Sequence, residues 1–386
     1  MSTSYTSSHY KLRKGLAYFV SFFALFYLLI NLSLVGLKAG NNWATGEWLI
    51  NYESGFVRRG LFGELVLRLT PHGIASIYIL LIFQFGLVVF LWIYLLRFAQ
   101  RNKFSSSSLL LILSPAGISF ISWDRYLFVR KEILGIVFII ILFRLLNSGL
   151  KEVHKLVIAI FSFVAVVLSS EVNLFFVPTI CFLLFTTTMI GRIKKLLWMF
   201  TFLFVSCIML FSTISYSGDQ TTANEVCRRI IEHGLEPRMN CDGAVAMLGV
   251  TLHEAFAQII ANLPDSLIFL PILALGLYPI YICWPKRVNK VWIMVVILGV
   301  SPLFFVAWDY GRWVFMIVVQ LSLIVIFSDD NKSLGSSSAK VTEKLLVGYT
   351  TMWGFAHTGT LFSNGWIGLL PSLARFLIDI LNSGNF

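Results

Sequence analysis

Acidic and basic side chains gather in one short segment of an otherwise apolar chain. Residues 51–64 read Asn-Tyr-Glu-Ser-Gly-Phe-Val-Arg-Arg-Gly-Leu-Phe-Gly-Glu and include Glu53, Glu64 and the pair Arg58 and Arg59. A glutamate held near arginines at a membrane surface can act as a general base, because burial and neighbouring charges tune its pKa. The forks of paired arginines match the oxygens of a phosphate or pyrophosphate. The segment therefore predicts an anionic substrate, although an anchoring helix whose arginines meet lipid phosphates is the alternative.

A second charged group lies between two apolar stretches, where a turn is expected. It consists of Asp124, Arg125, Arg130, Lys131 and Glu132. Basic residues are less common in the outer connectors of membrane proteins than in the inner ones. Arg130 and Lys131 therefore suggest substrate binding if this turn lies outside, and a salt-bridged cap on two helix ends is the alternative.

Two smaller groups complete the set of candidates. Glu171 stands where two apolar stretches meet, and Asp309 and Arg312 lie between two tryptophans. Ionisable side chains at membrane depth are costly and are usually paired or functional. Glu171 is expected to act in the site or to pair with Arg130 or Arg312. Asp309 and Arg312 are expected either to act on substrate or to form an ion pair at a helix end.

Membrane helices are the elements that must position these residues. The chain has 386 residues, of which 58% are hydrophobic and 13% are charged, and its mean hydropathy is +0.82. Soluble domains are about one-quarter charged, whereas recurring apolar runs of about 15 to 22 residues are typical of polytopic α-helical membrane proteins. We predict an all-α fold with about eleven spans, within a range of roughly ten to twelve, that forms one transmembrane domain over 1–386. The expected spans lie near 16–37, 74–97, 107–122, 133–148, 155–170, 172–190, 196–216, 266–284, 291–307, 312–328 and 345–362, and a stretch near 366–382 either re-enters the membrane or adds a twelfth.

The distribution of basic residues predicts the orientation. With the N-terminus in the cytoplasm, lysines and arginines form small clusters beside the inner ends of the expected spans, as the positive-inside rule requires. The net charge of +11 then reflects membrane topology. A nucleic-acid partner is not expected, because no basic soluble domain is present. We expect a multi-pass protein of the bacterial inner membrane, surrounded by lipid, whose charged groups face the periplasm.

Two outer loops are expected to carry the site. The first, 38–73, is expected to hold an amphipathic surface helix over 47–70, interrupted at a glycine. The second, 217–265, contains Cys227 and Cys241. A disulfide between them would suit an oxidising periplasm, and two unpaired thiols are the alternative.

With this organisation the chain resembles bacterial multi-span glycosyltransferases that use polyprenyl-linked sugars, namely the GT-C class and the O-antigen or capsule repeat-unit polymerases. The GT-C pattern places an acidic residue in the first outer loop, just after the first span, and Glu53 or Glu47 occupies that position. The family often has Asp there. In the repeat-unit polymerases, outer-loop arginines hold the lipid pyrophosphate. The corresponding candidates are Arg58, Arg59, Arg125, Arg130 and Arg312.

The resemblance implies transfer of a sugar or repeat unit at the outer leaflet. Glu53 would remove the proton of the acceptor hydroxyl, and Glu171 or Asp309 would orient the acceptor or Arg312. Arginines would stabilise the lipid phosphate as it leaves. No cofactor is expected, although Glu53 and Asp124 would suit a divalent cation. Other membrane proteins of polysaccharide assembly are expected partners.

Two other classes of function fit the same length and hydropathy. A transporter or flippase for lipid-linked oligosaccharides would need charges near the membrane midplane that are reachable from both sides. A membrane O-acyltransferase would rely on His and Arg near the start of the chain, where His9 is isolated. The enzyme interpretation instead requires that Glu53, Glu171 and Arg312 share one cleft.

Overall fold

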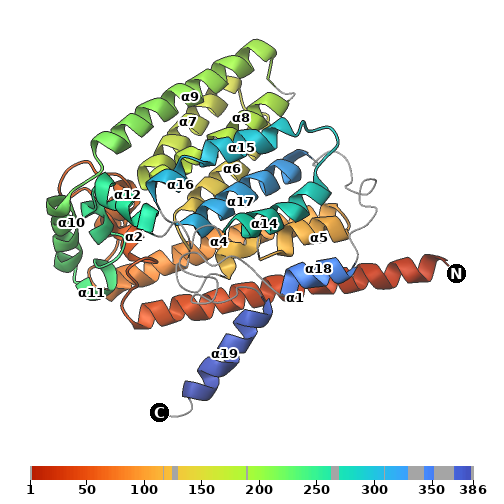
Figure 1. The fold of residues 1–386 in the computed structure, drawn as a ribbon, viewed down its shortest axis with the longest axis horizontal. Helices are drawn as coiled ribbons and strands as arrows, with labels where there is room; N and C mark the ends of the chain where they lie inside the picture. Colours follow the sequence, from red (N-terminus) through yellow and green to blue (C-terminus); the bar gives the residue numbers. More distant parts are fainter. Residues whose placement is uncertain are drawn as a thin grey trace. The chain divides into compact units, whose positions relative to one another are not determined.

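The computed structural model describes residues 2–115, 117–123, 129–187, 190–261, 269–307, 309–328, 343–351 and 369–383. In these ranges every regular element is a helix, as the sequence predicts (Figure 1). Contacts divide the chain into two compact units. Unit 1 comprises Met1–Ile30, Val88–Arg125 and Phe256–Phe386, and unit 2 comprises Asn31–Leu87 and Tyr126–Ala255.

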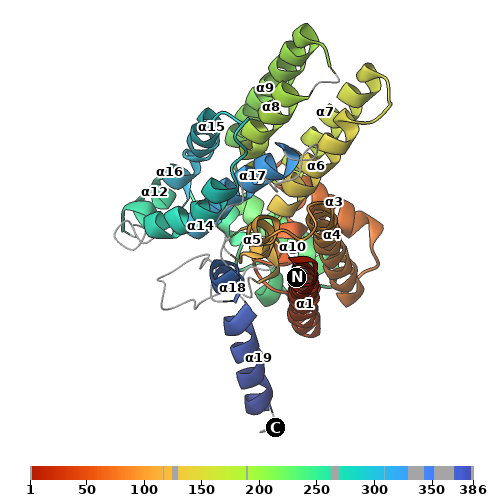
Figure 2. The ribbon, with the colours of Figure 1, turned by 90° about the vertical axis from the view of Figure 1, so that its right-hand side faces the viewer.

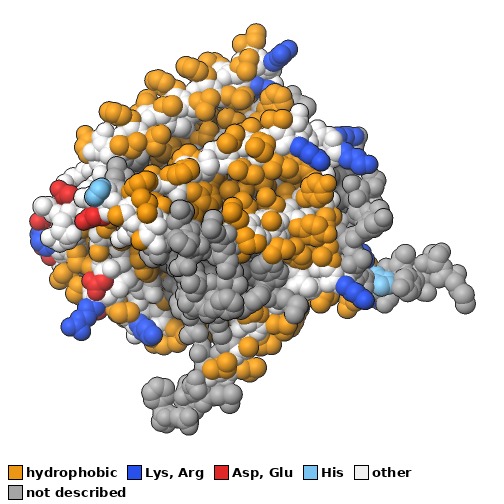
Figure 3. Space-filling model, viewed as in Figure 1, with side chains coloured by type: hydrophobic (Ala, Val, Ile, Leu, Met, Phe, Trp, Pro, Cys, Tyr) orange, Lys and Arg blue, Asp and Glu red, His pale blue; other side chains and the backbone are white. Residues whose placement is uncertain are grey.

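Unit 2 contains three apolar helices that lie side by side, α7, α8 and α9 (Figures 1 and 2). Helix α9 exposes Phe200, Phe204 and Phe211, and hydrophobic side chains cover its outer surface (Figure 3). Such a surface suits contact with lipid tails. The helices of unit 2 are α2 (Gly46–Leu49), α3 (Gly60–Leu69), α6 (Glu132–Leu146), α7 (Glu152–Ser169), η2 (Glu171–Phe176), α8 (Val177–Thr186), α9 (Arg192–Ser215), α10 (Gln220–Glu232), α11 (Pro237–Asn240) and η3 (Ala246–Gly249).

Unit 1 is built around α17, which is buried along nearly its whole length. Helices α14, α15 and η1 contact it, and Phe120 packs against Phe315 with ring centroids 4.9 Å apart. The helices of unit 1 are α5 (Ser106–Leu113), η1 (Ile118–Ser122), α14 (Phe269–Cys283), α15 (Val291–Val300), α16 (Leu303–Val306), α17 (Tyr310–Ser328), α18 (Glu343–Thr351) and α19 (Leu369–Ser383). Three helices have residues in both units, namely α1 (Ser2–Leu37), α4 (Ile74–Arg101) and α12 (Leu252–Ala261).

The structure corrects the predicted number of spans. Within the described residues, five helices are long and apolar enough to cross a membrane, not eleven. Several long apolar helices indicate a multi-pass membrane protein. The five are His9–Leu37, Ile74–Arg101, Glu152–Ser169, Arg192–Ser215 and Tyr310–Ser328.

Backbone breaks explain most of the difference in span number. The expected span 107–122 is divided into α5 and η1 at Ser114, and 291–307 is interrupted at Ser301 and Pro302. Helices α6 and α14 are 15 residues long, about 22 Å at 1.5 Å per residue, which is short of a bilayer core of about 30 Å. Of the span expected over 345–362, the structure describes only the part up to Thr351.

The surface helix expected over 47–70 is two helices, α2 and α3, joined by an irregular segment. Helix α3 packs tightly against the preceding backbone, because Gly60 lies against the Tyr52 ring and Gly63 against the Ile50 carbonyl, where neither leaves room for a Cβ. These two glycines therefore fold 50–63 into a compact turn, which fixes the backbone that carries Arg58 and Arg59.

Candidate functional site

The centre of the candidate site is an ion pair between Arg59 and Glu171, which are 112 positions apart in the sequence. Arg59 Nε donates to both carboxylate oxygens of Glu171 at 2.8 Å, and its Nη2 donates to Oε1 at 2.5 Å. Both side chains are mostly buried, with 17% and 15% of their surface exposed. The pair joins the segment before α3 to the start of η2.

The backbone at Arg59 is held in an unusual conformation. Its φ is +69°, in the left-handed region that residues other than glycine seldom adopt. The Nζ of Lys131, which is fully buried, donates to the Arg59 carbonyl oxygen at 2.8 Å. Lys131 therefore holds the peptide that directs the Arg59 side chain toward Glu171.

Glu47 and Arg130 lie on the other side of Arg59. Arg130 Nε is 2.9 Å from Glu47 Oε2, and Arg59 Nη1 is 3.8 Å from Glu47 Oε1. The Arg130 guanidinium also lies over the Trp43 ring, 5.4 Å from its centroid. Trp48 in α2 donates its indole N–H to the Val129 carbonyl at 2.9 Å, which fixes residues 129–131 against α2.

These contacts define the charged cluster of unit 2, which contains four basic and three acidic side chains. Burial favours the neutral form of Arg59, but Glu171, Glu47 and Glu132 outweigh this effect and raise the pKa of Arg59. Burial lowers the pKa of Lys131 to about 7, because Glu47 offsets only part of the desolvation. Its members are Glu47, Arg58, Arg59, Arg130, Lys131, Glu132 and Glu171.

Arg58 is the member of the charged cluster with the weakest contacts. Its Nη1 is 3.9 Å from Glu171 Oε1, and 27% of its side chain is exposed. The Nε of Arg58 is buried and has no hydrogen-bond partner. Because Glu171 already accepts three hydrogen bonds from Arg59, the Arg58 guanidinium keeps donors available for an anion.

Glu53 belongs to a different network, in which arginines of α10 hold it. Its two oxygens accept hydrogen bonds from Arg228 at 2.8 Å and from Arg229 at 2.6 Å. The hydrogen bond from Arg229 and the charges of both arginines lower the pKa of Glu53. Arg229 also lies 3.7 Å from Glu64, which pairs with Arg68. Glu53 thus joins the first loop to α10, and its carboxylate is a weak base.

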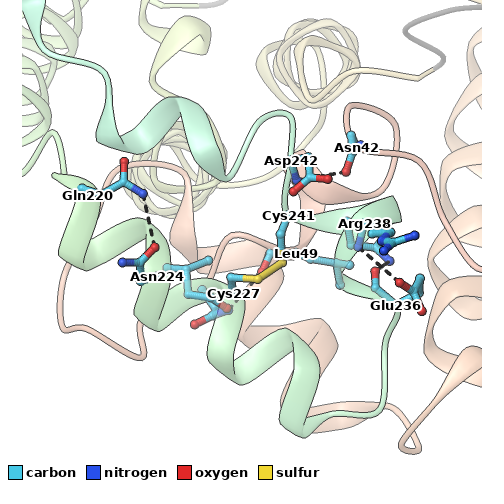
Figure 4. Close-up of a disulfide and its surroundings, with 12 residues drawn as sticks. Asn42, Leu49, Gln220, Asn224, Cys227, Glu236, Arg238, Cys241 and Asp242 are labelled. Atoms are coloured by element: carbon cyan, nitrogen blue, oxygen red, sulfur yellow. Dashed lines mark hydrogen bonds between the residues drawn. A yellow bond between two sulfur atoms is a disulfide. The ribbon is translucent and has the colours of Figure 1, made fainter.

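A disulfide fixes α10 to the segment that follows it. Cys227 in α10 is bonded to Cys241, which directly follows α11 (Figure 4). The Asp242 backbone N–H donates to the side chain of Asn42 at 3.1 Å. Of the two possibilities for Cys227 and Cys241, a disulfide or two unpaired thiols, the structure shows the disulfide, and the fold of 217–249 rests against the first loop.

A histidine pair joins the end of α10 to the turn between α3 and α4. The rings of His72 and His233 are stacked with centroids 4.4 Å apart, and His233 Nε2 lies 3.1 Å from the Pro71 carbonyl oxygen. Burial and the neighbouring charges of His72 and Arg229 lower the pKa of His233. The folded state therefore favours the neutral imidazole.

We expect the stability of the protein to fall when the pH drops below about 6.5, the ordinary pKa of histidine. A lowered pKa in the folded state means that the unfolded chain binds more protons in this range, so the stability present above pH 6.5 is lost as the pH falls. Thermal unfolding in detergent between pH 5 and pH 8 measures this dependence. His233→Gln should flatten it, whereas the exposed His253→Gln should not; the same slope in all three proteins would contradict the prediction.

The remaining candidates belong to unit 1 or fall outside the described residues. Asp309 and Arg312 belong to unit 1, where Arg312 Nη1 is 3.3 Å from Asp309 Oδ2. Asp124 and Arg125 lie outside the described residues. Within the part of the chain that the structure describes, no three His, Cys, Asp or Glu side chains gather closely enough to hold a metal ion.

Residues from three of the four charged groups of the sequence thus lie in unit 2. The ion-pair partner of Glu171, however, differs from the expected one. Glu171 was expected to act or to pair with Arg130 or Arg312, and it pairs with Arg59. Arg228 and Arg229 were not among the residues that the sequence predicted for the site. The sequence feature that could have indicated a charged helix here is the spacing in α10. Glu225 and Glu232 lie three and four positions from Arg228, on the same side of the helix, and both form ion pairs with it.

Comparison with protein-family models, with curated proteins and with solved structures finds no match for this chain.

Proposed function

We propose that this protein is a glycosyltransferase or polymerase of the bacterial inner membrane, and that it acts at the periplasmic face on polyprenyl-(pyro)phosphate-linked sugars during O-antigen or capsule assembly. The observation that carries the proposal is Arg58, a partly exposed side chain with unused donors at the edge of a buried cluster of charged residues. A phosphate at this position would gain charge-assisted hydrogen bonds. The disulfide supports a periplasmic location for the same unit, with the N-terminus in the cytoplasm.

The chemistry follows from the charge that develops on the leaving group. In the transfer, an acceptor hydroxyl would attack the anomeric carbon and form the new glycosidic bond while the bond to the phosphate oxygen breaks, and the hydroxyl proton would pass to the released phosphate or to water. Negative charge collects on the phosphate oxygens as they leave, and cations fixed in advance lower the barrier. Arg58 would bind these oxygens directly. Glu171 fixes the guanidinium of Arg59 through short hydrogen bonds and lies 3.9 Å from Arg58, so positive charge is already in place when the negative charge appears.

Deletion of the gene, followed by electrophoresis of surface polysaccharide, tests the proposal. Loss of the ladder with one unit retained would identify a polymerase, and a uniformly smaller unit would identify a transferase of a side branch. Accumulation of the complete lipid-linked saccharide on the cytoplasmic leaflet would instead indicate a flippase. Unchanged polysaccharide that has lost only acyl groups would indicate an acyltransferase, and either of these last two results overturns the proposal.

We expect Glu53→Gln to retain transfer activity within about tenfold of the natural protein. A general base contributes about 10²- to 10⁴-fold, but both oxygens of Glu53 are occupied by arginines of α10. The measurement is transfer by purified protein in lipid nanodiscs, normalised to protein content. Complete loss of activity in a normally folded variant would assign the base to Glu53 after all.

A further inference from the structure

Three aromatic rings, those of Tyr52, Phe56 and Tyr216, form a chain of contacts, and the first two lie close to Arg58 in the sequence. Tyr52 stacks on Phe56 with centroids 5.7 Å apart, and Phe56 meets Tyr216 edge to face at 5.3 Å. Phe56 and Tyr216 are 41% and 54% exposed, respectively. Tyr52 lies behind them against Gly60. Two exposed rings and one partly buried ring therefore form a continuous aromatic surface.

This aromatic surface is connected to Arg58 through the backbone. The N–H of Arg58 donates to the carbonyl oxygen of Tyr216 at 3.2 Å, so the end of α9 is bonded to the segment that holds the guanidinium. The exposed residues Ser54 and Gly55 lie beside Phe56. The rings thus lie where the end of an apolar helix meets the exposed residues 54 and 55 and the backbone of Arg58.

We infer that Phe56 and Tyr216, backed by Tyr52, form the surface on which the sugar ring next to the bound phosphate stacks. The inference rests on the proposed function and names a sugar contact for it. Aromatic faces bury apolar C–H groups of a ring with little loss of side-chain entropy. The charge of Arg58 selects this occupant, because a sugar joined to a lipid phosphate presents an anion and a ring side by side.

Binding of two lipids tests the inference. One is the saccharide-bearing polyprenyl diphosphate extracted from a strain that lacks the gene, and the other is bare polyprenyl diphosphate. Each is titrated into purified protein in nanodiscs. Phe56→Leu and Tyr216→Leu keep an apolar side chain but remove the ring, and each should weaken binding of the saccharide-bearing lipid roughly three- to tenfold. Neither should change binding of the bare lipid.

Phe204→Leu is the matched control, because Phe204 is 57% exposed and stacks on Phe200 in the middle of α9. It should change binding of neither lipid. Equal weakening of both lipids by the Phe56 and Tyr216 variants would make these residues membrane anchors and overturn the inference, as would no effect on either. Failure of the proposed function gives a different result, in which Arg58→Gln leaves binding of both lipids unchanged.

Discussion

Glu171→Gln should lower the free energy of unfolding by about 3 to 5 kcal/mol, the usual effect of removing one partner from a buried ion pair. The amide that replaces the carboxylate would leave the buried guanidinium of Arg59 without its principal counter-charge. Arg58 and Lys131 lie in the same cluster, so the excess of positive charge would grow. Denaturant unfolding in detergent micelles measures the effect.

A surface ion pair provides the control for this prediction. Glu152 pairs with Lys194, and 34% and 60% of these side chains are exposed. Glu152→Gln should therefore cost less than about 1 kcal/mol. The double variant Glu171→Gln with Arg59→Gln should recover part of the lost stability, because it removes the uncompensated charge. Equal effects of Glu171→Gln and Glu152→Gln would contradict the prediction.

The convergence of charges in unit 2 could be predicted from the sequence, but the pairing could not. An acid such as Glu171 between apolar stretches must find a partner, because an isolated charge away from water is costly. This argument predicts that a basic residue comes close. It does not choose between Arg59 and Arg130, because that choice depends on the left-handed backbone at Arg59 and on the bond from Lys131.

The partners of Glu53 show a second limit of sequence reasoning. Its position after the first apolar run suggested a catalytic base, and the nearest arginines in the sequence, Arg58 and Arg59, were the partners that the sequence suggested. In the structure the partners come from α10, 175 and 176 positions away. Only the packing of α10 against the first loop, which the disulfide reinforces, brings them to Glu53.

The all-α architecture followed from composition, whereas the number of spans depended on where helices end. Hydropathy cannot distinguish one apolar run from two short helices joined by a bend. Ser301 and Pro302 separate α15 from α16, and Glu171 lies in a 3₁₀ segment before α8. Such breaks place polar backbone inside apolar sequence, where irregular structure is tolerated only if other protein groups or water satisfy it.

Arg58→Gln should lower kcat/KM for the lipid-linked donor roughly 100-fold while leaving the fold intact. A charge-assisted hydrogen bond to phosphate contributes more than a neutral one, and a loss of about 2.7 kcal/mol corresponds to this factor. The fold should tolerate the change, because Arg58 is 3.9 Å from Glu171 and partly exposed. Arg59→Gln should instead reduce the yield of folded protein, because Arg59 supplies all three short contacts to Glu171.

Arg228→Gln is the control for general effects of charge, since Arg228 is 50% exposed and binds Glu53 outside the charged cluster. It removes the same charge from the same unit and should change kcat/KM by less than about threefold. Transfer in nanodiscs and thermal unfolding, measured on all three variants, separate the two roles of the adjacent arginines. If Arg58→Gln loses stability as Arg59→Gln does, or keeps normal transfer, Arg58 is a structural residue and the phosphate must bind elsewhere. If only transfer is lost, the two neighbouring arginines have different functions. Arg59 is neutralised by Glu171 and stabilises the fold, whereas Arg58 is left free to neutralise the phosphate of the substrate.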